Sequence, residues 1–142
     1  MPIRTSEAEW QGNLREGGGT MKLGSGAYEG KYSFGSRFEE EPASNPEELI
    51  AAAHAGCFSM AFAGGLSNAG FVPTRVHTTA RVHITRGDSG FSITKIELHT
   101  EGEVPGIDAA TFQAQAEAAK AGCPVSRALA AVTDISVEAK LL

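Results

Sequence analysis

The chain has 142 residues, of which 42% are hydrophobic and 20% are charged, a composition typical of a globular protein and not of a disordered one. Its net charge of -5, with Lys and Arg residues scattered along the chain, argues against nucleic acid or an anionic membrane surface as the main partner. The first residues lack the apolar segment of a secretory signal, and no uninterrupted apolar run predicts a membrane span. We therefore expect a single cytoplasmic domain over residues 1–142.

Residues 3–38 predict a β-meander of two or three short strands. Apolar and aromatic side chains are spread among polar ones there, and Gly17-Gly18-Gly19 is a strong turn signal. The predicted meander ends near Phe38, so that Arg37 lies in its last residues. The acidic run Glu39-Glu40-Glu41 before Pro42 predicts a solvated loop.

A long helix is predicted to begin after Asn45 and to end near Gly70 and Pro73. Asn45 suits the N-cap, Pro46 the first helical position, and Glu48 the position of the acid in a capping box. The helix has about 24 residues and is about 36 Å long. Small residues surround most of its circumference, so we expect burial on most sides, partly by a partner chain. The expected apolar face consists of Leu49, Ile50, Ala53, Cys57, Met60, Ala61 and Gly64.

The rest of the chain predicts a hairpin, two further helices and a last strand. Residues 75–85 alternate strictly between apolar and polar side chains, as a half-buried strand does. In the returning strand, the apolar phase shifts between Ile93 and Ile96, which indicates a β-bulge. The order of elements predicts an α+β fold. The predicted elements are a strand from Phe91 to Val104, a helix capped by Asp108 through Lys120, a short helix from Cys123-Pro124 through Ala131, and a strand around Ile135, Val137 and Ala139.

The two cysteines, Cys57 and Cys123, both lie among Ala and Gly residues that allow close approach to the sulfur. In a reducing cytosol, a disulfide between them would be transient and catalytic or redox-sensing. Cys123 lies at a helix start before Pro124, where free N–H groups and the helix dipole favour a thiolate. Cys57 lies mid-helix in an apolar setting, which raises its pKa unless a cation is near. Because free cysteines are often structural, the residues alone leave both a reactive pair and two inert core thiols open.

Arg37 is the best candidate for that cation, although a solvated surface arginine is the simpler interpretation. Glu47 and Glu48 are most simply charges that complement the helix dipole. Glu47 and Cys57 are ten residues apart on one helix, about 15 Å along its axis, so they cannot share a site within one chain. Two antiparallel copies of this helix, crossing near their middles, would bring Glu47 of one chain toward Cys57 of the other and create two identical composite sites.

A metal site is the alternative interpretation of the same residues. His54 and Cys57 are one helical turn apart and would supply three zinc ligands together with Cys123. No C-x-x-C or H-E-x-x-H pattern accompanies them. The alternative functions are therefore a non-catalytic metal-binding or redox-sensing dimeric module, or a structural dimer with inert thiols. The other histidines lie on predicted strands, where we expect surface positions: His77, His83 and His99.

The segments around both cysteines resemble the two cysteine motifs of the OsmC/Ohr family of hydroperoxide-resistance proteins. Residues 45–61, NPEELIAAAHAGCFSMA, resemble the first motif, and residues 119–126, AKAGCPVS, resemble the second. Shorter matches at 37–39, 70–74, 93–96 and 104–108 extend the resemblance over essentially the whole chain. The HAGCFSM form and the position of Arg37 are similar to the osmotically inducible protein C branch, with Gly56 in place of the Ala of close relatives.

The resemblance implies an intertwined homodimer, with sheets packed around two central helices, and a cofactor-free thiol peroxidase that reduces organic hydroperoxides in stress defence. It makes Cys57 the peroxidatic cysteine, which becomes a sulfenic acid, and Cys123 the resolving cysteine of an intramolecular disulfide. Arg37 is then the activating cation, oriented by Glu47 of the partner chain. An external dithiol, on a lipoyl-bearing or thioredoxin-like protein, resets the disulfide. The expected apolar substrate pocket consists of Phe38, Phe58, Met60 and Phe62.

Overall fold

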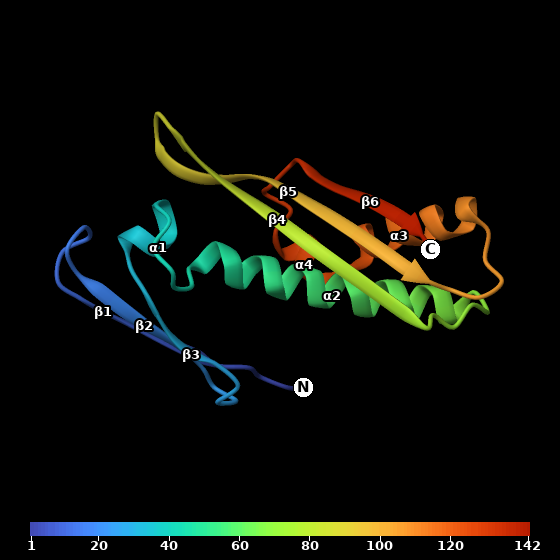
Figure 1. Cartoon of the computed structure of the whole chain (residues 1–142), viewed down its shortest axis with the longest axis horizontal. Helices are drawn as coiled ribbons and strands as arrows, with labels where there is room; N and C mark the ends of the chain where they lie inside the picture. The colour runs from blue at the N-terminus through green and yellow to red at the C-terminus, as the bar shows by residue number, and fades with distance from the viewer. The chain divides into compact units, whose positions relative to one another are not determined.

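The computed structural model describes all 142 residues and divides into two compact units, Met1–Leu49 and Ile50–Leu142, which are described one at a time. The single domain expected from the length stays a prediction. The elements are β1 (Ser6–Gln11), β2 (Gly18–Leu23), β3 (Glu29–Tyr32), α1 (Phe34–Phe38), α2 (Pro46–Asn68), β4 (Arg75–Gly87), β5 (Gly90–Glu103), α3 (Ala109–Gly122), α4 (Pro124–Ala128) and β6 (Ile135–Leu141) (Figure 1).

The first unit contains the predicted meander, an antiparallel sheet in the order β1-β2-β3. Gly19 pairs with Trp10 on one side and with Tyr32 on the other, and the two aromatic rings lie 5.3 Å apart between centroids. A Cβ at position 19 would lie 2.5 Å from the Tyr32 ring and 2.9 Å from the Trp10 ring. The glycine therefore gives the two rings the space in which they pack.

The segment predicted as the end of the meander is instead the short helix α1. Its first turn is closed by a capping box, in which the Ser33 hydroxyl accepts the Ser36 N–H at 3.0 Å. The Ser36 hydroxyl in turn accepts the Ser33 N–H at 2.9 Å. The prediction of a strand up to Phe38 is wrong because these local side-chain bonds satisfy the backbone in place of a strand partner. Arg37 is thus carried by a helix.

The second unit is built on a three-stranded sheet in the order β4-β5-β6, with α2 running along it (Figure 1). β4 and β5 form the predicted antiparallel hairpin, and β6 pairs with β5 in parallel through the α3 crossover. The alternation predicted for residues 75–85 is confirmed from Arg75 to Val82 and is interrupted at His83, which is half-buried like its two neighbours. The predicted bulge is also confirmed, because the register shifts between His83 and Ile84 and leaves Thr94 as the extra residue of β5.

The long helix α2 begins as predicted. The Glu48 N–H donates to Asn45 Oδ1 at 2.8 Å, and Pro46 occupies the first helical position. The helix ends at Asn68, two residues before Gly70, whose φ of +93° suits a glycine that ends a helix. By length and composition α2 is also apolar enough to cross a membrane, although no uninterrupted apolar run marks it. Core helices share this property.

The buried face of α2 differs from the predicted one. Its buried side chains recur every fourth residue, and they pack against β5 and α3 in the hydrophobic core. Ala and Gly occupy 9 of the 23 positions of α2, so the few large side chains decide which face packs within one chain. The burial of the predicted face by a partner chain stays a prediction. Met60 is 79% exposed, and Gly56 and Gly64 are exposed beside it. The buried stripe is His54, Phe58, Phe62 and Leu66.

Candidate active site

The two cysteines meet in the second unit. Cys57 lies in the middle of α2, Cys123 lies between α3 and α4, and their Sγ atoms are 2.8 Å apart. Both are free thiols, with Cys123 fully buried and Cys57 partly exposed. This distance lets the two sulfurs form a disulfide by a small side-chain movement. The exposure lets a small molecule reach Cys57 first.

The local sequence places the Cys123 sulfur at a helix start. Cys123 has φ of -60° and ψ of 123°, an extended conformation that is favoured before a proline. Its N–H donates to the Ala119 carbonyl at 2.9 Å and closes α3, and its carbonyl accepts the Arg127 N–H at 3.1 Å and opens α4. Pro124 occupies the first position of α4 without leaving an N–H unpaired. The predicted helix start at Cys123-Pro124 is confirmed, although α4 ends at Ala128.

The pKa values of the two thiols are shifted in opposite directions. Burial raises the pKa of Cys57, and its hydrogen bond with Cys123 raises it further. Burial also acts to raise the pKa of Cys123, but hydrogen bonds from Cys57, from the Ser126 N–H and hydroxyl, and from the Val125 N–H lower it below the ordinary value. Because the two thiols interact, their protons are lost in a coupled way, and of the two the thiolate is favoured on Cys123. Cys57 therefore needs a further cation to become the nucleophile.

The first unit contains a candidate for that cation. The Arg37 guanidinium binds the Glu47 carboxylate through Nε, at 3.2 Å from both oxygens, and through Nη2, at 2.7 Å from Oε1. The Glu47 side chain is 9% exposed and that of Arg37 is 37% exposed. Asn45 Nδ2 also donates to the Ser36 carbonyl at 2.9 Å, which ties α1 to the start of α2. The Arg37 guanidinium is thus held in a fixed orientation by Glu47 and remains partly exposed.

The structure shows which glutamate binds Arg37 and that this glutamate belongs to the same chain. The partner of Arg37 is Glu47, whereas Glu48 is exposed at the start of α2. We expected Glu47 to come from a second chain, but the ion pair forms within one chain. The reason is the capping box at Ser33, which turns the residues before α2 into a helix and brings Arg37 back toward Glu47.

The predicted substrate pocket is only partly supported. Phe58 and Phe62 have no exposed surface and belong to the core, where Phe62 lies 5.0 Å from the Phe112 ring. Met60 points away from that core. Phe38 does line a hollow of about 230 Å³ in the first unit, beside Arg37. The other residues that line this hollow are Trp10, Leu14, Tyr32, Ser33 and Phe34.

His54 takes a role that the sequence did not predict. It is fully buried, and its Nε2 lies 2.7 Å from Ser126 Oγ. Burial lowers its pKa, so the ring is neutral near pH 7. The structure has no group of three or more His, Cys, Asp or Glu side chains that could hold a metal ion, so the zinc hypothesis gains no support. One signal was available: His54 precedes Cys57 by three residues, and Ser126 follows Cys123 by three.

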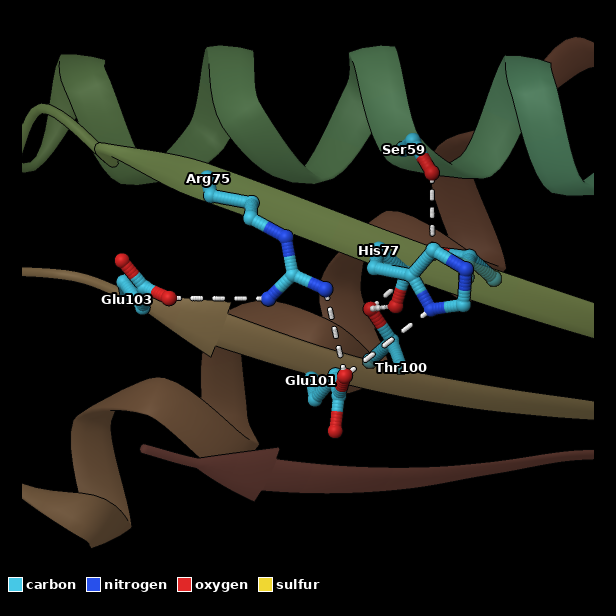
Figure 2. Close-up of polar contacts among 7 residues, drawn as sticks. Ser59, Arg75, His77, Thr100, Glu101 and Glu103 are labelled. Atoms are coloured by element: carbon cyan, nitrogen blue, oxygen red, sulfur yellow. Dashed lines mark hydrogen bonds and ion pairs between the residues drawn. The ribbon is translucent and has the colours of Figure 1, made fainter.

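A row of hydroxyl groups fixes the orientation of α2 two residues after Cys57. Ser59 Oγ donates to Thr78 Oγ1 at 2.8 Å, and Thr78 lies 2.9 Å from Thr100 Oγ1. Figure 2 shows this row beneath Ser59, and ion pairs of Arg75 with Glu101 and Glu103 nearby. His77 belongs to the same polar network at the surface, as predicted from the alternation of β4.

Comparison with known proteins places this fold and this pair of thiols in a family. The family model described as "OsmC-like protein" matches residues 39–138, more than half of the chain. The chain belongs to the OsmC-like family. The matched residues of this OsmC-like chain include Glu47 and both cysteines, and Arg37 lies two residues before the first of them.

Individual relatives agree with this assignment. Peroxiredoxin OsmC of Escherichia coli (strain K12) is 49% identical over 138 residues, which are 96% of each chain. The organic hydroperoxide resistance protein OhrA of Bacillus subtilis (strain 168) is 31% identical over 100 residues, 69% of this chain and 68% of OhrA. The crystal structure of an organic hydroperoxide resistance protein from Elizabethkingia anophelis has a TM-score of 0.72 at 27% identity and covers 99% of this chain and 96% of its own. The predicted α+β fold is confirmed.

Proposed function

We propose that this OsmC-like protein is a cysteine-based peroxidase that reduces organic hydroperoxides to alcohols, without a cofactor, in defence against oxidative stress. The observation that carries the proposal is the 2.8 Å separation of two free thiols with unequal pKa shifts and unequal exposure. The names of the relatives, a peroxiredoxin and an organic hydroperoxide resistance protein, support the same chemistry.

In the proposed reaction, Cys57 and Cys123 act in turn. The Cys57 thiolate attacks the terminal peroxide oxygen, the O–O bond breaks, and the alkoxide leaves and takes a proton to become the alcohol. Cys57 is then a sulfenic acid. The Cys123 thiolate attacks its sulfur and displaces hydroxide, which leaves as water after protonation. The resulting disulfide is reduced by exchange with an external dithiol, for which we propose a lipoyl-bearing or thioredoxin-like protein.

The proposed activator of Cys57 is the Arg37–Glu47 pair of a second copy of the chain. A guanidinium beside a buried sulfur offsets the desolvation that raises the Cys57 pKa. Because ten residues of α2 separate Glu47 from Cys57, the two cannot meet on one helix. The exposed face of α2 around Gly56 and Met60 gives a second copy an apolar surface to cover. A symmetric homodimer would then contain two composite sites.

Substrate selectivity follows from the surroundings of Arg37. The aromatic hollow that includes Phe38 adjoins this guanidinium, and an alkyl or aryl group fits it better than water does. We therefore propose a preference for organic hydroperoxides over hydrogen peroxide. A reducing cytoplasm, in which the thiols are regenerated, is the compartment that suits this cycle.

The test is a peptide map after treatment of the reduced protein with one equivalent of tert-butyl hydroperoxide. We expect a Cys57–Cys123 disulfide within one chain and stoichiometric tert-butanol. Cys57→Ser is expected to abolish turnover, whereas Cys123→Ser is expected to stop after one turnover with a sulfenic acid that dimedone traps. Full turnover by the Cys57→Ser variant contradicts the proposed mechanism.

A further inference from the structure

Two short contacts join α2 to the start of α4, and the proposed peroxidase cycle uses only one of them. The first is the 2.8 Å approach of the Cys57 and Cys123 sulfurs. The second is a hydrogen bond of 2.7 Å between His54 Nε2 and Ser126 Oγ, in which His54 is fully buried and Ser126 is 8% exposed. The two contacts share no atom, so the second can hold the helices together whatever happens at the sulfurs.

The contacts lie one helical turn apart on both sides. His54 precedes Cys57 by three residues on α2, and Ser126 follows Cys123 by three residues at the start of α4. Residues three apart are neighbours on one face of a helix, so the two contacts lie side by side. One contact alone would let α4 pivot about it, whereas two contacts fix both the distance and the rotation of α4 relative to α2.

The hydrogen bond matters for α4 because this helix has little else that is buried. Of its five residues, Pro124–Ala128, only Ser126 is buried. Leu129, which follows the helix, is half-buried. A helix of this length is not stable by itself in water. The Ser126 hydroxyl is therefore the group within α4 that fixes its orientation.

His54 is an unfavourable choice for its position if stability alone is considered. The other members of the buried stripe of α2 are apolar, and His54 Nδ1 is buried without a hydrogen-bond partner. The cost of such an unsatisfied nitrogen is comparable to the gain from one neutral hydrogen bond. The imidazole adds a directed bond to α4, which an apolar side chain cannot make. Either tautomer of the neutral ring makes it, because a serine hydroxyl both donates and accepts.

We propose that His54 and Ser126 are positioning residues whose hydrogen bond holds α4 on α2 in the reduced protein and so keeps the Cys123 sulfur within bonding distance of Cys57. The disulfide then forms by a small side-chain movement, without unfolding of either helix.

The consequence for the reaction rests on the proposed function. In that cycle the Cys123 sulfur attacks the Cys57 sulfenic acid, the S–S bond forms, the S–O bond breaks and the oxygen leaves as water. A sulfur held in place reacts faster because its positioning entropy is already lost. Without the His54–Ser126 bond, α4 is freer in the reduced protein, and disulfide formation must remove that freedom.

The first experiment measures the Cys57–Cys123 disulfide at equilibrium with reduced and oxidised dithiothreitol, without peroxide. The dithiol gives two electrons and two protons to the protein disulfide, and alkylation of the free thiols followed by mass spectrometry gives the ratio of the two forms. We expect Ser126→Ala and His54→Leu each to lower the equilibrium constant for disulfide formation about tenfold, as the loss of one hydrogen bond implies, which raises the reduction potential by about 30 mV. Ser126→Thr, which keeps the hydroxyl, is expected to stay near wild type.

Ser59→Ala is the matched control. It removes a hydrogen bond of 2.8 Å between α2 and Thr78 of β4, two residues after Cys57, and leaves the contact with α4 intact. Its disulfide equilibrium is expected to be that of the wild type. The double variant His54→Leu/Ser126→Ala is expected to lose about tenfold, as each single variant does, because both remove the same bond. A Ser126→Ala constant equal to that of Ser59→Ala, or additive losses in the double variant, overturns the proposal.

A second measurement keeps the proposal testable if the variants do not fold. In the reduced wild-type protein, the Arg127 and Leu129 N–H groups bond to the Cys123 and Val125 carbonyls, so their hydrogen exchange reports whether α4 is held. We expect clear protection, and exchange at the rate of an unfolded chain overturns the proposal. Neither measurement uses peroxide, so both results are independent of whether the proposed peroxidase activity is found. Where that activity is found, the Cys57 sulfenic acid formed by tert-butyl hydroperoxide is expected to persist about tenfold longer in Ser126→Ala than in Ser59→Ala.

Discussion

At the scale of single residues, the two thiols differ in the groups that stabilise their charge. Cys123 receives hydrogen bonds from α4 that lower its pKa within one chain. Burial and the neighbouring thiol raise the pKa of Cys57, and only the Val125 N–H lowers it. A resolving cysteine can therefore be prepared by its own chain, whereas the attacking cysteine depends on an added positive charge. The Arg37–Glu47 pair supplies a charge of the required kind.

Replacement of Arg37 tests this dependence. A positive charge favours the thiolate and lowers the Cys57 pKa, so Arg37→Gln is expected to raise that pKa. Near pH 7 the rate of peroxide consumption is expected to fall about tenfold for each unit by which the Cys57 pKa rises. The pH–rate profile is expected to move to higher pH. Arg37→Lys keeps the charge but loses the two-nitrogen contact with Glu47, so an intermediate rate is expected.

The control for this series is Arg81→Gln on β4. Its side chain is 63% exposed and its partner is Glu97, so this variant removes the same positive charge from a different ion pair. Stopped-flow consumption of an organic hydroperoxide between about pH 5 and pH 10, a range that includes the usual thiol pKa of about 8.5, measures both variants. An Arg37→Gln profile that coincides with that of Arg81→Gln contradicts the role of Arg37.

At the scale of elements, sequence patterns predicted the long segments better than the short ones. The start of α2 was predictable because Asn45 and Pro46 each have one well-defined role at a helix N-terminus. The β-bulge was predictable because the apolar phase of β5 changes there. α1 was not, because it is held by Ser33 and Ser36, which bond each other's N–H groups without the usual acid.

In the candidate site, too, local sequence patterns predicted some features and missed others. The sequence motifs predicted four site residues, which are both cysteines, Arg37 and Glu47. In the structure the two cysteines lie together, and Arg37 binds Glu47. The sequence did not indicate which face of α2 is buried. Phe58 and Phe62 were therefore predicted to line a pocket, whereas they belong to the core. The bond of His54 to Ser126 spans 72 residues and has no local pattern. Contacts of this kind depend on tertiary packing, which periodicity does not describe.

Gly56 offers a test of α2 itself. A Cβ at this position meets nothing within 4 Å, so Gly56→Ala is expected to stabilise the protein by about 0.5–1 kcal/mol through lower backbone entropy of the unfolded chain. Gly102→Ala is the contrasting variant, because its Cβ would lie 2.8 Å from the Phe112 ring and destabilise by about 1–3 kcal/mol. Urea unfolding measures both. A destabilised Gly56→Ala protein would show that another chain occupies the space beside this residue.

At the scale of the whole molecule, the central question is whether one chain can complete a site. The thiols lie in the second unit and the Arg37–Glu47 pair in the first. If each active site combines thiols of one chain with the cation of another, the homodimer is the catalytic unit and a monomer is inactive. Dilution below the dimer dissociation constant is then expected to abolish turnover.

A complementation experiment distinguishes the two arrangements directly. Arg37→Gln lacks the cation and Cys57→Ser lacks the nucleophile, so each homodimer is expected to be nearly inactive. In a mixed dimer, Cys57 of the first variant would face Arg37 of the second, and one of the two sites would be intact. Random exchange of subunits makes about half of the dimers mixed, so about one quarter of wild-type activity is expected to return. Mixing Arg37→Gln with the Cys57→Ser/Arg37→Gln double variant supplies no intact Arg37 and is the control. If the first mixture stays as inactive as this control although native mass spectrometry shows mixed dimers, Arg37 acts on the thiols of its own chain.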